Sequence, residues 1–475
     1  MSGSARGGNR SIARNAGYLV GAKVASRTLR VIYTVVLARL FGPELFGLFT
    51  YAQFWQVIFM SLAIFGTGRM LSRQIGADRS HAERHVGANI SLRLLTSCIA
   101  MLGCALVALD PSLTPQGRDL MLLFAAAVLA RSLAAWAQQV FIAFEVSHLS
   151  LRQELLFRSL EVVVGLGVLA QGGGLVAVAV VHMASWVLQA IAGWRLVNRR
   201  IVPVRFEWRI KELLRLARNG IAIMLVGLSL SVLIQGGLVM YRLLLDEPAD
   251  LGQLAVLLQV LGLLAMVPKS VAAAALPVLS RWVAEGAGDE RRSMTLMLRT
   301  AIIGAAGLAS LASVLGPLLI PWLVGEQYRV AGELIPLALW LLLPLSLCTL
   351  MNQLMTAHGE FWRAAMVAIS GAVFMGIVIA LTLPELGLNA VFLGIAAGAT
   401  LWAAVEGGFA VRAGWLDGFD AFGRAGLAVV VAALAFWSLA GVSPWLALFT
   451  SWLLLLPGLA SPQVLWRRMR GIRRT

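Results

Sequence analysis

The chain has 475 residues, of which 59% are hydrophobic and only 13% are charged, and its mean hydropathy is +0.83. This composition excludes a soluble globular protein and is typical of a chain that crosses a membrane repeatedly. The net charge of +16 would suggest a nucleic-acid partner in a soluble protein. Here the basic residues lie mostly between apolar segments, so membrane topology accounts for them and no nucleic-acid partner is expected.

Fourteen apolar segments are long enough to cross a bilayer as helices. They are residues 16–40, 46–72, 87–109, 119–144, 150–170, 175–197, 213–241, 251–280, 294–315, 330–356, 362–383, 387–411, 422–440 and 443–465. We therefore expect an all-α polytopic membrane protein with about fourteen transmembrane helices. The three cysteines lie in apolar segments and predict neither a disulfide framework nor a metal site.

Lys and Arg are distributed asymmetrically between the two sides of the predicted membrane. If the N-terminus is cytoplasmic, 26 of the 39 basic residues lie on the cytoplasmic side and only Arg118, Arg242 and Arg329 lie in outer loops. Cytoplasmic loops retain an excess of Lys and Arg, so we expect both termini in the cytoplasm. The first apolar segment is too long for the hydrophobic part of a signal peptide, and no cleaved signal is expected.

The first apolar segment carries three basic residues on one helical face. Lys23, Arg27 and Arg30 are spaced i, i+4 and i+7. A cation at the bilayer centre costs roughly 3 kcal/mol or more. We therefore predict that this face lines a water-filled cavity, and that the cavity receives an anion.

Two stretches of the chain resemble each other and indicate an internal repeat. Pro43-Glu-Leu-Phe-Gly47 opens the second segment, and Pro248-Ala-Asp-Leu-Gly252 opens the eighth. Leu-Ser-Arg closes both segments, at residues 71–73 and 279–281. Six spans separate the copies, so they are parallel and predict two lobes. The predicted domains are an N-terminal lobe (1–197), a cytoplasmic amphipathic linker (198–212), a C-terminal lobe (213–412) and an extra helical hairpin with a basic cytoplasmic tail (413–475).

Further intramembrane cations extend the predicted cavity. Lys269 follows Pro268, which would kink the eighth span and give the second lobe a cation. Arg131 and Arg299 would line the cavity or bond between helices. The predicted substrate-binding residues are Arg27, Arg30, Lys269, Lys23, Arg131 and Arg299.

Other polar residues in the spans are open to structural explanations. Arg39, Arg69 and Arg93 lie near span ends, where they can extend to the headgroups. Arg158 has Glu161 at i+3, so an internal ion pair competes with a substrate contact. Packing or a hydrogen bond is the favoured role for His182. Carboxylates are scarce in the spans, and the sequence identifies no coupling ion.

The sequence contains no catalytic constellation. It has no phosphate-binding glycine loop and no metal-ligand spacing, and no outer loop exceeds about fifteen residues. We therefore expect a transporter without a cofactor and not an enzyme.

Residues 38–49 read Ala-Arg-Leu-Phe-Gly-Pro-Glu-Leu-Phe-Gly-Leu-Phe, just after a first span that opens Asn15-Ala-Gly-Tyr18. This pattern resembles polysaccharide transporters of the multidrug/oligosaccharidyl-lipid/polysaccharide (MOP) flippase superfamily, and the resemblance extends through residues 141–182 and 361–397. It implies two six-helix lobes in a V around a central cavity, with two extra C-terminal helices. Arg27 and Arg30 match the family's cationic cavity residues in type and place.

The resemblance also implies a function and a location. The protein would flip an undecaprenyl-diphosphate-linked oligosaccharide from the cytoplasmic to the periplasmic leaflet of the bacterial inner membrane, by alternating access. Its partners would be this polyprenyl-diphosphate-linked glycan, membrane lipids and a polysaccharide polymerase or glycosyltransferase.

Three alternatives remain open. Peptidoglycan-precursor lipid flippases of the same superfamily also have fourteen spans. A drug or small-molecule antiporter typically has a carboxylate in the first span, and residues 15–40 contain none. A membrane enzyme acting on the same lipid carrier is disfavoured by the short outer loops.

Overall fold

The computed structural model describes residues 2–459 except 246, 271, 273–278 and 280–289. Contacts divide the chain into two compact units, Met1–Val239 with Glu247–Gly252, and Met240–Asp246 with Gln253–Thr475. Each unit is a helical bundle of its own. The lobe boundaries proposed from the sequence stay predictions.

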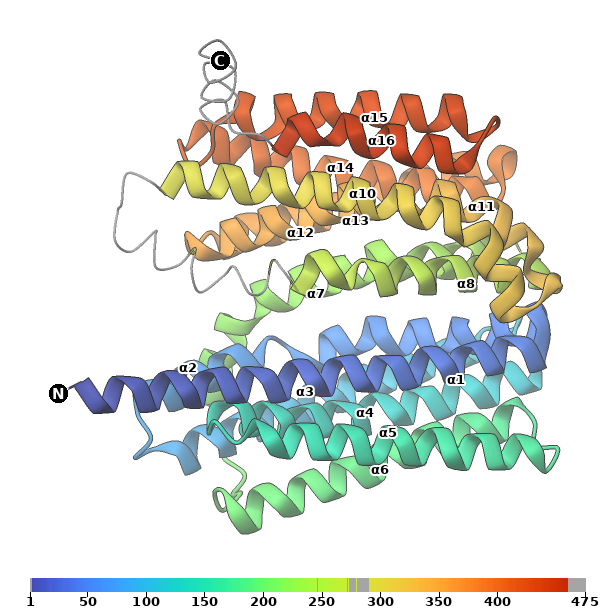
Figure 1. The fold of residues 1–475 in the computed structure, drawn as a ribbon. Coiled ribbons are helices and arrows are strands. Elements are labelled where there is room, and N and C mark those ends of the chain that lie inside the picture. The colour runs from blue at the N-terminus through green and yellow to red at the C-terminus, as the bar shows by residue number, and fades with distance from the viewer. Residues whose placement is uncertain (1, 246, 271, 273–278, 280–289, 460–475) are drawn as a thin grey trace. The chain divides into compact units, whose positions relative to one another are not determined.

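The first unit contains seven helices among the residues described (Figure 1). They are α1 (Ser2–Ile64), α2 (Thr67–Ala77), α3 (Ala82–Leu106) with a 3₁₀ turn (Val107–Leu109), α4 (Pro115–Ala143), α5 (Ser147–Ala170), α6 (Leu175–Arg200) and most of α7 (Ile210–Leu244). Trp136 is fully buried in a core to which α2, α3, α4 and α6 contribute.

The second unit contains most of α8 and the helices that follow it. They are α8 (Pro248–Leu264), α10 (Glu290–Val324), α11 (Arg329–Leu339), α12 (Leu342–Ala357), α13 (Phe361–Leu386), α14 (Leu388–Arg412), α15 (Arg424–Ala440) and α16 (Pro444–Leu459). Short helical turns lie at Glu326–Tyr328 and Phe419–Gly423. Apolar residues of α10, α12, α14, α15 and α16 form the core of this unit.

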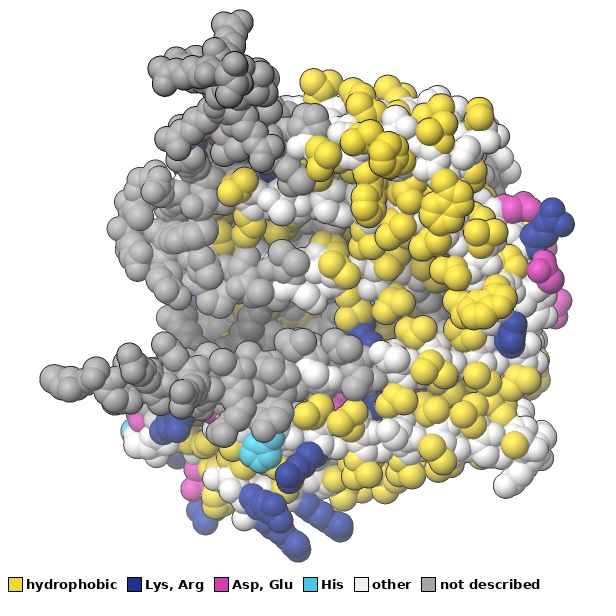
Figure 2. All heavy atoms as spheres, viewed as in Figure 1, with side chains coloured by type: hydrophobic (Ala, Val, Ile, Leu, Met, Phe, Trp, Pro, Cys, Tyr) yellow, Lys and Arg dark blue, Asp and Glu magenta, His cyan; other side chains and the backbone are white. Residues whose placement is uncertain are grey.

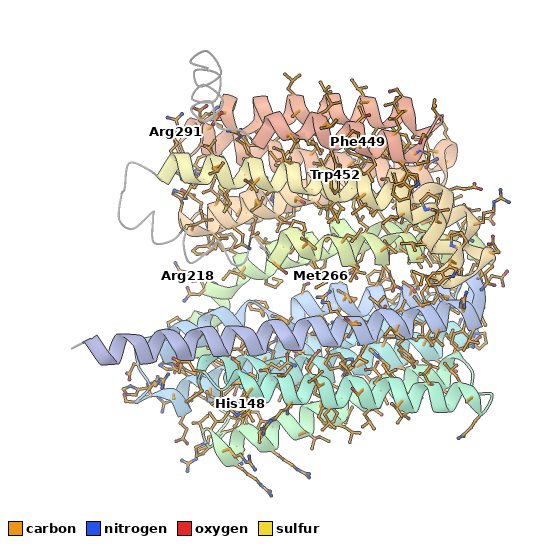
Figure 3. All side chains as sticks on the ribbon, viewed as in Figure 1. His148, Arg218, Met266, Arg291, Phe449 and Trp452 are labelled. Carbon is orange, nitrogen blue, oxygen red and sulfur yellow. The ribbon has the colours of Figure 1, made fainter. Side chains whose placement is uncertain are left out.

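The described part of the chain contains helices and no strand, which confirms the all-α class. Nine described helices are long and apolar enough to cross a membrane, and α11 and α12 form a further pair bent by 47°. Hydrophobic side chains cover much of the face seen in Figure 2. On α16, Phe449 and Trp452 are 65% and 47% exposed (Figure 3). Such a surface suits lipid, and the chain is a multi-pass membrane protein.

The structure breaks the second predicted span. Helix α1 consists of two helical segments separated by a kink at Gly42, whose φ of 70° and ψ of 175° are not helical. It ends at Ile64, because Phe65 and Gly66 both have positive φ, 50° and 65°. The expected helix over 46–72 is therefore two helices, α1 and α2.

The two repeat motifs occupy equivalent positions. Pro43 follows the kink of α1 and Pro248 is the first residue of α8, so each proline lies where a helical N–H needs no partner. The two motif glycines also meet within the first unit. A Cβ on Gly47 would lie 2.8 Å from the backbone nitrogen of Gly252, and a Cβ on Gly252 would collide with the carbonyl oxygen of Pro43.

The linker is extended and lies against α3. The backbone N–H of Glu207 donates to the Ser91 hydroxyl at 3.0 Å, and Arg205 forms an ion pair with Glu83 at 3.1 Å. The side chains of Phe206 and Trp208 stack on each other and are 45% and 53% exposed. This arrangement presents aromatic rings beside basic residues, as at a membrane interface.

Arg299 ties three parts of the second unit together. Its side chain on α10 is 2% exposed. Its guanidinium donates to the carbonyl oxygen of Gly458 at 2.6 and 3.1 Å and forms an ion pair with Asp420 at 3.3 Å. The arginine that the sequence assigned to the cavity thus connects α10 to α16 and to the turn before α15.

We expect Gly252→Ala to destabilise the protein by roughly 1–3 kcal/mol, because the added methyl group requires backbone movement. The free energy of unfolding in detergent or bicelles measures this effect. Gly262→Ala is the matched control in the same helix, since nothing lies within 4 Å of its added Cβ. Equal stability of the two variants would show that the glycines are not in close contact.

We expect Arg299→Ala to lower the free energy of unfolding by about 3 kcal/mol, because it leaves a buried carbonyl and a carboxylate without their cation. Arg291→Ala, at the exposed start of the same helix (Figure 3), is the control and should change stability little. A stable Arg299→Ala variant would contradict the connecting role.

Candidate functional site

A cluster of polar side chains lies where α1, α4, α5 and α6 of the first unit meet. Helix α5 carries Glu154, Arg158 and Glu161 at i, i+4 and i+7, so they share one face. Helix α6 carries a second polar stripe, which runs from His182 to Gln189. Opposed stripes let side chains hydrogen-bond inside an otherwise apolar bundle.

Glu154 bonds to three neighbouring helices at once. Its carboxylate accepts hydrogen bonds from Ser26 of α1 at 2.7 Å and from Gln138 of α4 at 2.7 Å. Gln189 of α6 donates to the same carboxylate at 3.5 Å. The group is thereby held by neutral donors and fixes one negative charge among the arginines.

Arg158 is buried, at 3% exposed, and both of its terminal guanidinium nitrogens have partners. Its guanidinium forms an ion pair with Glu161 and donates to Ser185 at 3.2 Å and to Gln189 at 3.1 Å. It also lies 3.8 Å from the ring centroid of Trp186. The internal ion pair suggested by the i+3 spacing is therefore present.

His182 continues this network. Its Nδ1 lies 2.7 Å from Glu161 Oε1, and its Nε2 accepts a hydrogen bond from the Trp186 indole at 3.2 Å. The side chain is 5% exposed. The hydrogen-bonding role favoured by the sequence is confirmed.

Three arginines differ from Arg158 in being less buried. Arg27 is exposed, and Arg30 and Arg131 are half-buried. Arg131 donates to Gln56 at 3.4 Å and lies 5.2 Å from the centroid of Trp186. Within the described part of the chain, no hydrogen bond or ion pair reaches the Arg30 guanidinium. It lies within electrostatic range of the other three arginines.

The cluster carries an excess of positive charge. Four arginines face two carboxylates, Glu154 and Glu161, which leaves +2 when His182 is neutral. The half-buried Arg30 and the exposed Arg27 are the members of the cluster that a ligand can reach. A site of this kind can bind an anion bidentately.

The other predicted site residues lie in the second unit or have side chains outside the described part of the chain. Lys269 and Arg299 belong to the second unit, where Lys269 is half-buried in a helical turn after Pro268. The side chain of Lys23 is outside the described residues, as is that of Arg69. Only Arg27, Arg30 and Arg131 of the predicted set are brought together here.

Two features departed from expectation. Arg93 does not extend to the headgroups: it is fully buried and donates to Gln139 of α4, because its position on α3 faces the neighbouring helix. Glu154 was not assigned to the site, since it lies near the end of a span. Its spacing with Arg158 and Glu161 was the signal that could have identified it.

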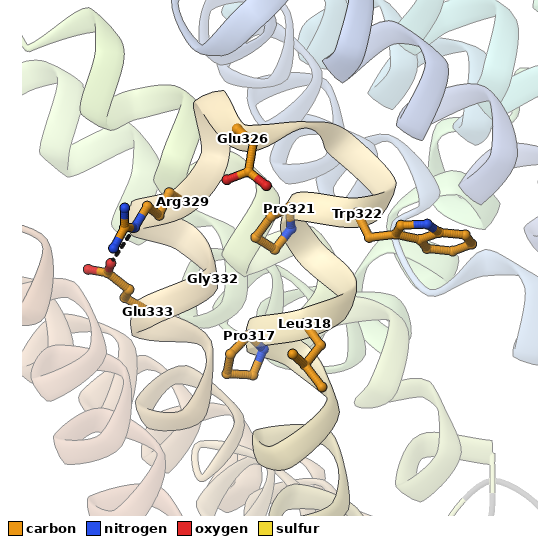
Figure 4. Close-up of a pocket in the computed structure, with 8 residues that line it drawn as sticks. All are labelled: Pro317, Leu318, Pro321, Trp322, Glu326, Arg329, Gly332 and Glu333. Carbon is orange, nitrogen blue, oxygen red and sulfur yellow. Dashed lines mark hydrogen bonds and ion pairs between the residues drawn. The ribbon is translucent and has the colours of Figure 1, made fainter. Parts of the chain in front are cut away.

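A cavity of about 400 Å³ lies in the second unit, at the bend between α10 and α11 (Figure 4). Its lining includes Trp322, Glu326, Arg329 and Glu333. Arg329 and Glu333 pair with each other at 3.0 Å, so the only basic side chain of this lining already faces a carboxylate. This cavity is a weaker anion site than the arginine cluster.

Comparisons with solved structures identify the fold. The chain is similar to a multidrug resistance MATE family transporter of the MOP superfamily in an inward-facing conformation, with a TM-score of 0.66 and 17% identity, covering 80% of this chain and 92% of that one. It is similar to a MOP superfamily transporter from Pyrococcus furiosus, described as having a binding pocket of reverse polarity (TM-score 0.63, 16% identity, 83% and 93% covered). It is also similar to the lipid II flippase MurJ (TM-score 0.63, 11% identity, 95% and 99% covered).

No curated protein matches the sequence. A family model described as "Polysaccharide biosynthesis protein" matches residues 12–283, which is more than half of the chain. This span includes the whole arginine cluster and the Arg-Leu-Phe-Gly-Pro motif. The protein, which has the fold of MOP-superfamily transporters, therefore belongs to the polysaccharide biosynthesis protein family.

Proposed function

We propose that this protein flips an undecaprenyl-diphosphate-linked oligosaccharide from the cytoplasmic to the periplasmic leaflet of the bacterial inner membrane. In this proposal Arg27, Arg30 and Arg131 bind the diphosphate. The family links the chain to polysaccharide biosynthesis, and the fold is that of transporters. The observation that carries the proposal is the half-buried Arg30, which has no hydrogen-bonding or ion-pairing partner among the residues described.

The charge of the cluster matches the charge of the proposed ligand. A diphosphate that bridges a polyprenyl chain and a sugar keeps two ionised oxygens, so its charge is −2. The four arginines and two glutamates carry +2. The ligand would therefore neutralise the cluster, whereas a neutral or cationic drug would leave its positive charge without a counter-charge inside the membrane.

Transport of such a molecule requires a polar path for the headgroup alone. A diphosphate and its sugars cannot cross about 30 Å of hydrocarbon unaided. The polyprenyl chain can remain in lipid while the headgroup is held by arginine. Two lobes that open alternately to each side would then invert the headgroup, and Lys269 would be the cation of the second lobe.

A peptidoglycan-precursor flippase is the second candidate. Its substrate carries the same diphosphate, and the similarity to the lipid II flippase MurJ covers 95% of this chain. The arginine cluster would serve both substrates equally. In either case the substrate would come from a glycosyltransferase and pass to a polymerase.

We expect Arg27→Ala/Arg30→Ala to reduce flipping at least tenfold, because it removes the two accessible guanidinium groups and lowers the charge of the cluster to zero. A short-glycan polyprenyl diphosphate is incorporated into proteoliposomes, and an impermeant sugar-modifying reagent measures its outer-leaflet fraction. Arg39→Ala, an exposed arginine on the same helix, is the control and should retain activity.

Retention of full flipping by the double variant would place the diphosphate site elsewhere. Absence of flipping by the wild type, under an imposed membrane potential and with both an oligosaccharide-linked and a peptidoglycan-type lipid, would contradict the flippase proposal.

We expect Glu154→Gln to tighten binding of a diphosphate headgroup about tenfold, because it removes a negative charge that opposes the ligand. Affinity is measured for farnesyl-diphosphate-glucose with the purified protein. Glu145→Gln, an exposed glutamate that pairs with Arg79 at 3.1 Å, is the control. Unchanged affinity in a stable Glu154→Gln variant would show that the ligand does not bind near this carboxylate.

A further inference from the structure

The hydrogen bonds of His182 define its protonation state. The Trp186 indole N–H can only donate, so the imidazole nitrogen that receives it, Nε2, carries no proton. The other nitrogen, Nδ1, lies 2.7 Å from a carboxylate oxygen of Glu161 and therefore carries the proton. In this structure His182 is a neutral imidazole that accepts on one side and donates on the other.

A second proton on His182 would break one of these bonds. Protonated Nε2 becomes a donor, and it would face the Trp186 N–H, another donor, at 3.2 Å. The two groups would have to separate. The bond to Glu161 would persist and become charge-assisted, because Nδ1 donates in both states.

Trp186 connects this nitrogen to the arginines. The guanidinium carbons of Arg158 and Arg131 lie 3.8 and 5.2 Å from the centroid of its ring. Movement of the indole away from His182 would alter the surface on which both cations lie. A proton on His182 therefore acts on the same arginines that face the proposed ligand.

Three charged groups on neighbouring helices act on this proton: Glu161 and Arg158 of α5 and Arg30 of α1. Tyr33 of α1, Arg131 of α4 and Glu154 of α5 interact in turn with Glu161 or Arg158. On the α4 side, the ring of Phe124 lies 5.2 Å from the imidazole. The arginines oppose a positive imidazole, and Glu161 favours it. A dianion bound between the arginines would offset their repulsion, so anion binding and proton binding favour each other.

We propose that His182 is a proton-binding site, at which the protein takes up one proton when the diphosphate of its substrate binds to Arg27, Arg30 and Arg131. The inference rests on the proposed function and names the proton as the cation coupled to it. By linkage, affinity for the diphosphate rises as the pH falls, by at most tenfold per pH unit.

Calorimetry of the full-length protein in nanodiscs tests this proposal. The probe is farnesyl-diphosphate-glucose, a diphosphate diester with no titrating group near neutral pH. Titrations in buffers with different ionisation enthalpies give the number of protons taken up for each ligand bound. The wild type is expected to take up a large fraction of one proton, and His182→Gln close to none.

The glutamine variant keeps the neutral hydrogen bonds. Its amide oxygen can accept from Trp186 and its amide nitrogen can donate to Glu161, so the variant is expected to fold and to bind the probe. His148→Gln is the matched control, because His148 lies at the start of α5 (Figure 3) and outside this hydrogen-bond chain. It should leave proton uptake unchanged.

The outcomes separate the two proposals. If the wild type binds the probe and His182→Gln takes up as many protons as the wild type, the proton site is wrong and the diphosphate site stands. If the wild type does not bind the probe, the proposed function fails and the proton site fails with it. Trp186→Phe adds an independent readout, since loss of the opposing N–H should move proton uptake to higher pH.

Discussion

The need to place charges inside the hydrocarbon beside opposite charges or hydrogen-bonding groups governs the arginine cluster of the first unit. The cluster brings four arginines together, and the side chains of α5 supply the two carboxylates that make this arrangement tolerable. Glu161 forms an ion pair with Arg158, and Glu154 is held by serine and glutamine donors from α1, α4 and α6. Among the described members of the cluster, Arg27 is exposed and Arg30 is half-buried, so these two are the most accessible to a ligand.

The second unit treats a similar charge differently. Arg299 is surrounded by a carbonyl oxygen of α16 and the carboxylate of Asp420, and the pair holds the C-terminal helices to α10. Its burial leaves no room for a ligand. The comparison between Arg299 and Arg30 shows why residue type alone is a poor indicator of function in a membrane helix. Both are arginines in apolar segments. Arg299 is bonded to other parts of the fold, whereas Arg30 is half-buried and lacks such partners among the described residues.

Local patterns in the sequence were sufficient for the all-α class and for half of the cluster. The all-α class follows from long apolar segments, and the Arg158–Glu161 pair follows from a spacing of three residues on one helix. The partners of Arg299 and Arg93 could not be predicted in this way, because Gly458 is 159 residues from Arg299 and Gln139 is 46 residues from Arg93. The break at Phe65 was also missed, since an apolar run does not reveal a residue with positive φ. Contacts between helices depend on how the helices are rotated about their axes, which a single sequence does not specify.

A transporter must release what it binds, and the composition of the cluster suits this need. Four arginines without carboxylates would hold a diphosphate too strongly to let it leave, because electrostatic attraction is large where water is scarce. Glu154 and Glu161 reduce the excess to +2, so the bound dianion and the cluster are matched and not overcompensated. The residual positive charge is also small enough for one proton on His182 to change it by half. A site whose charge is set by the difference between a few opposing groups responds strongly to the gain or loss of one of them, and this sensitivity allows a small event to alter affinity for the substrate.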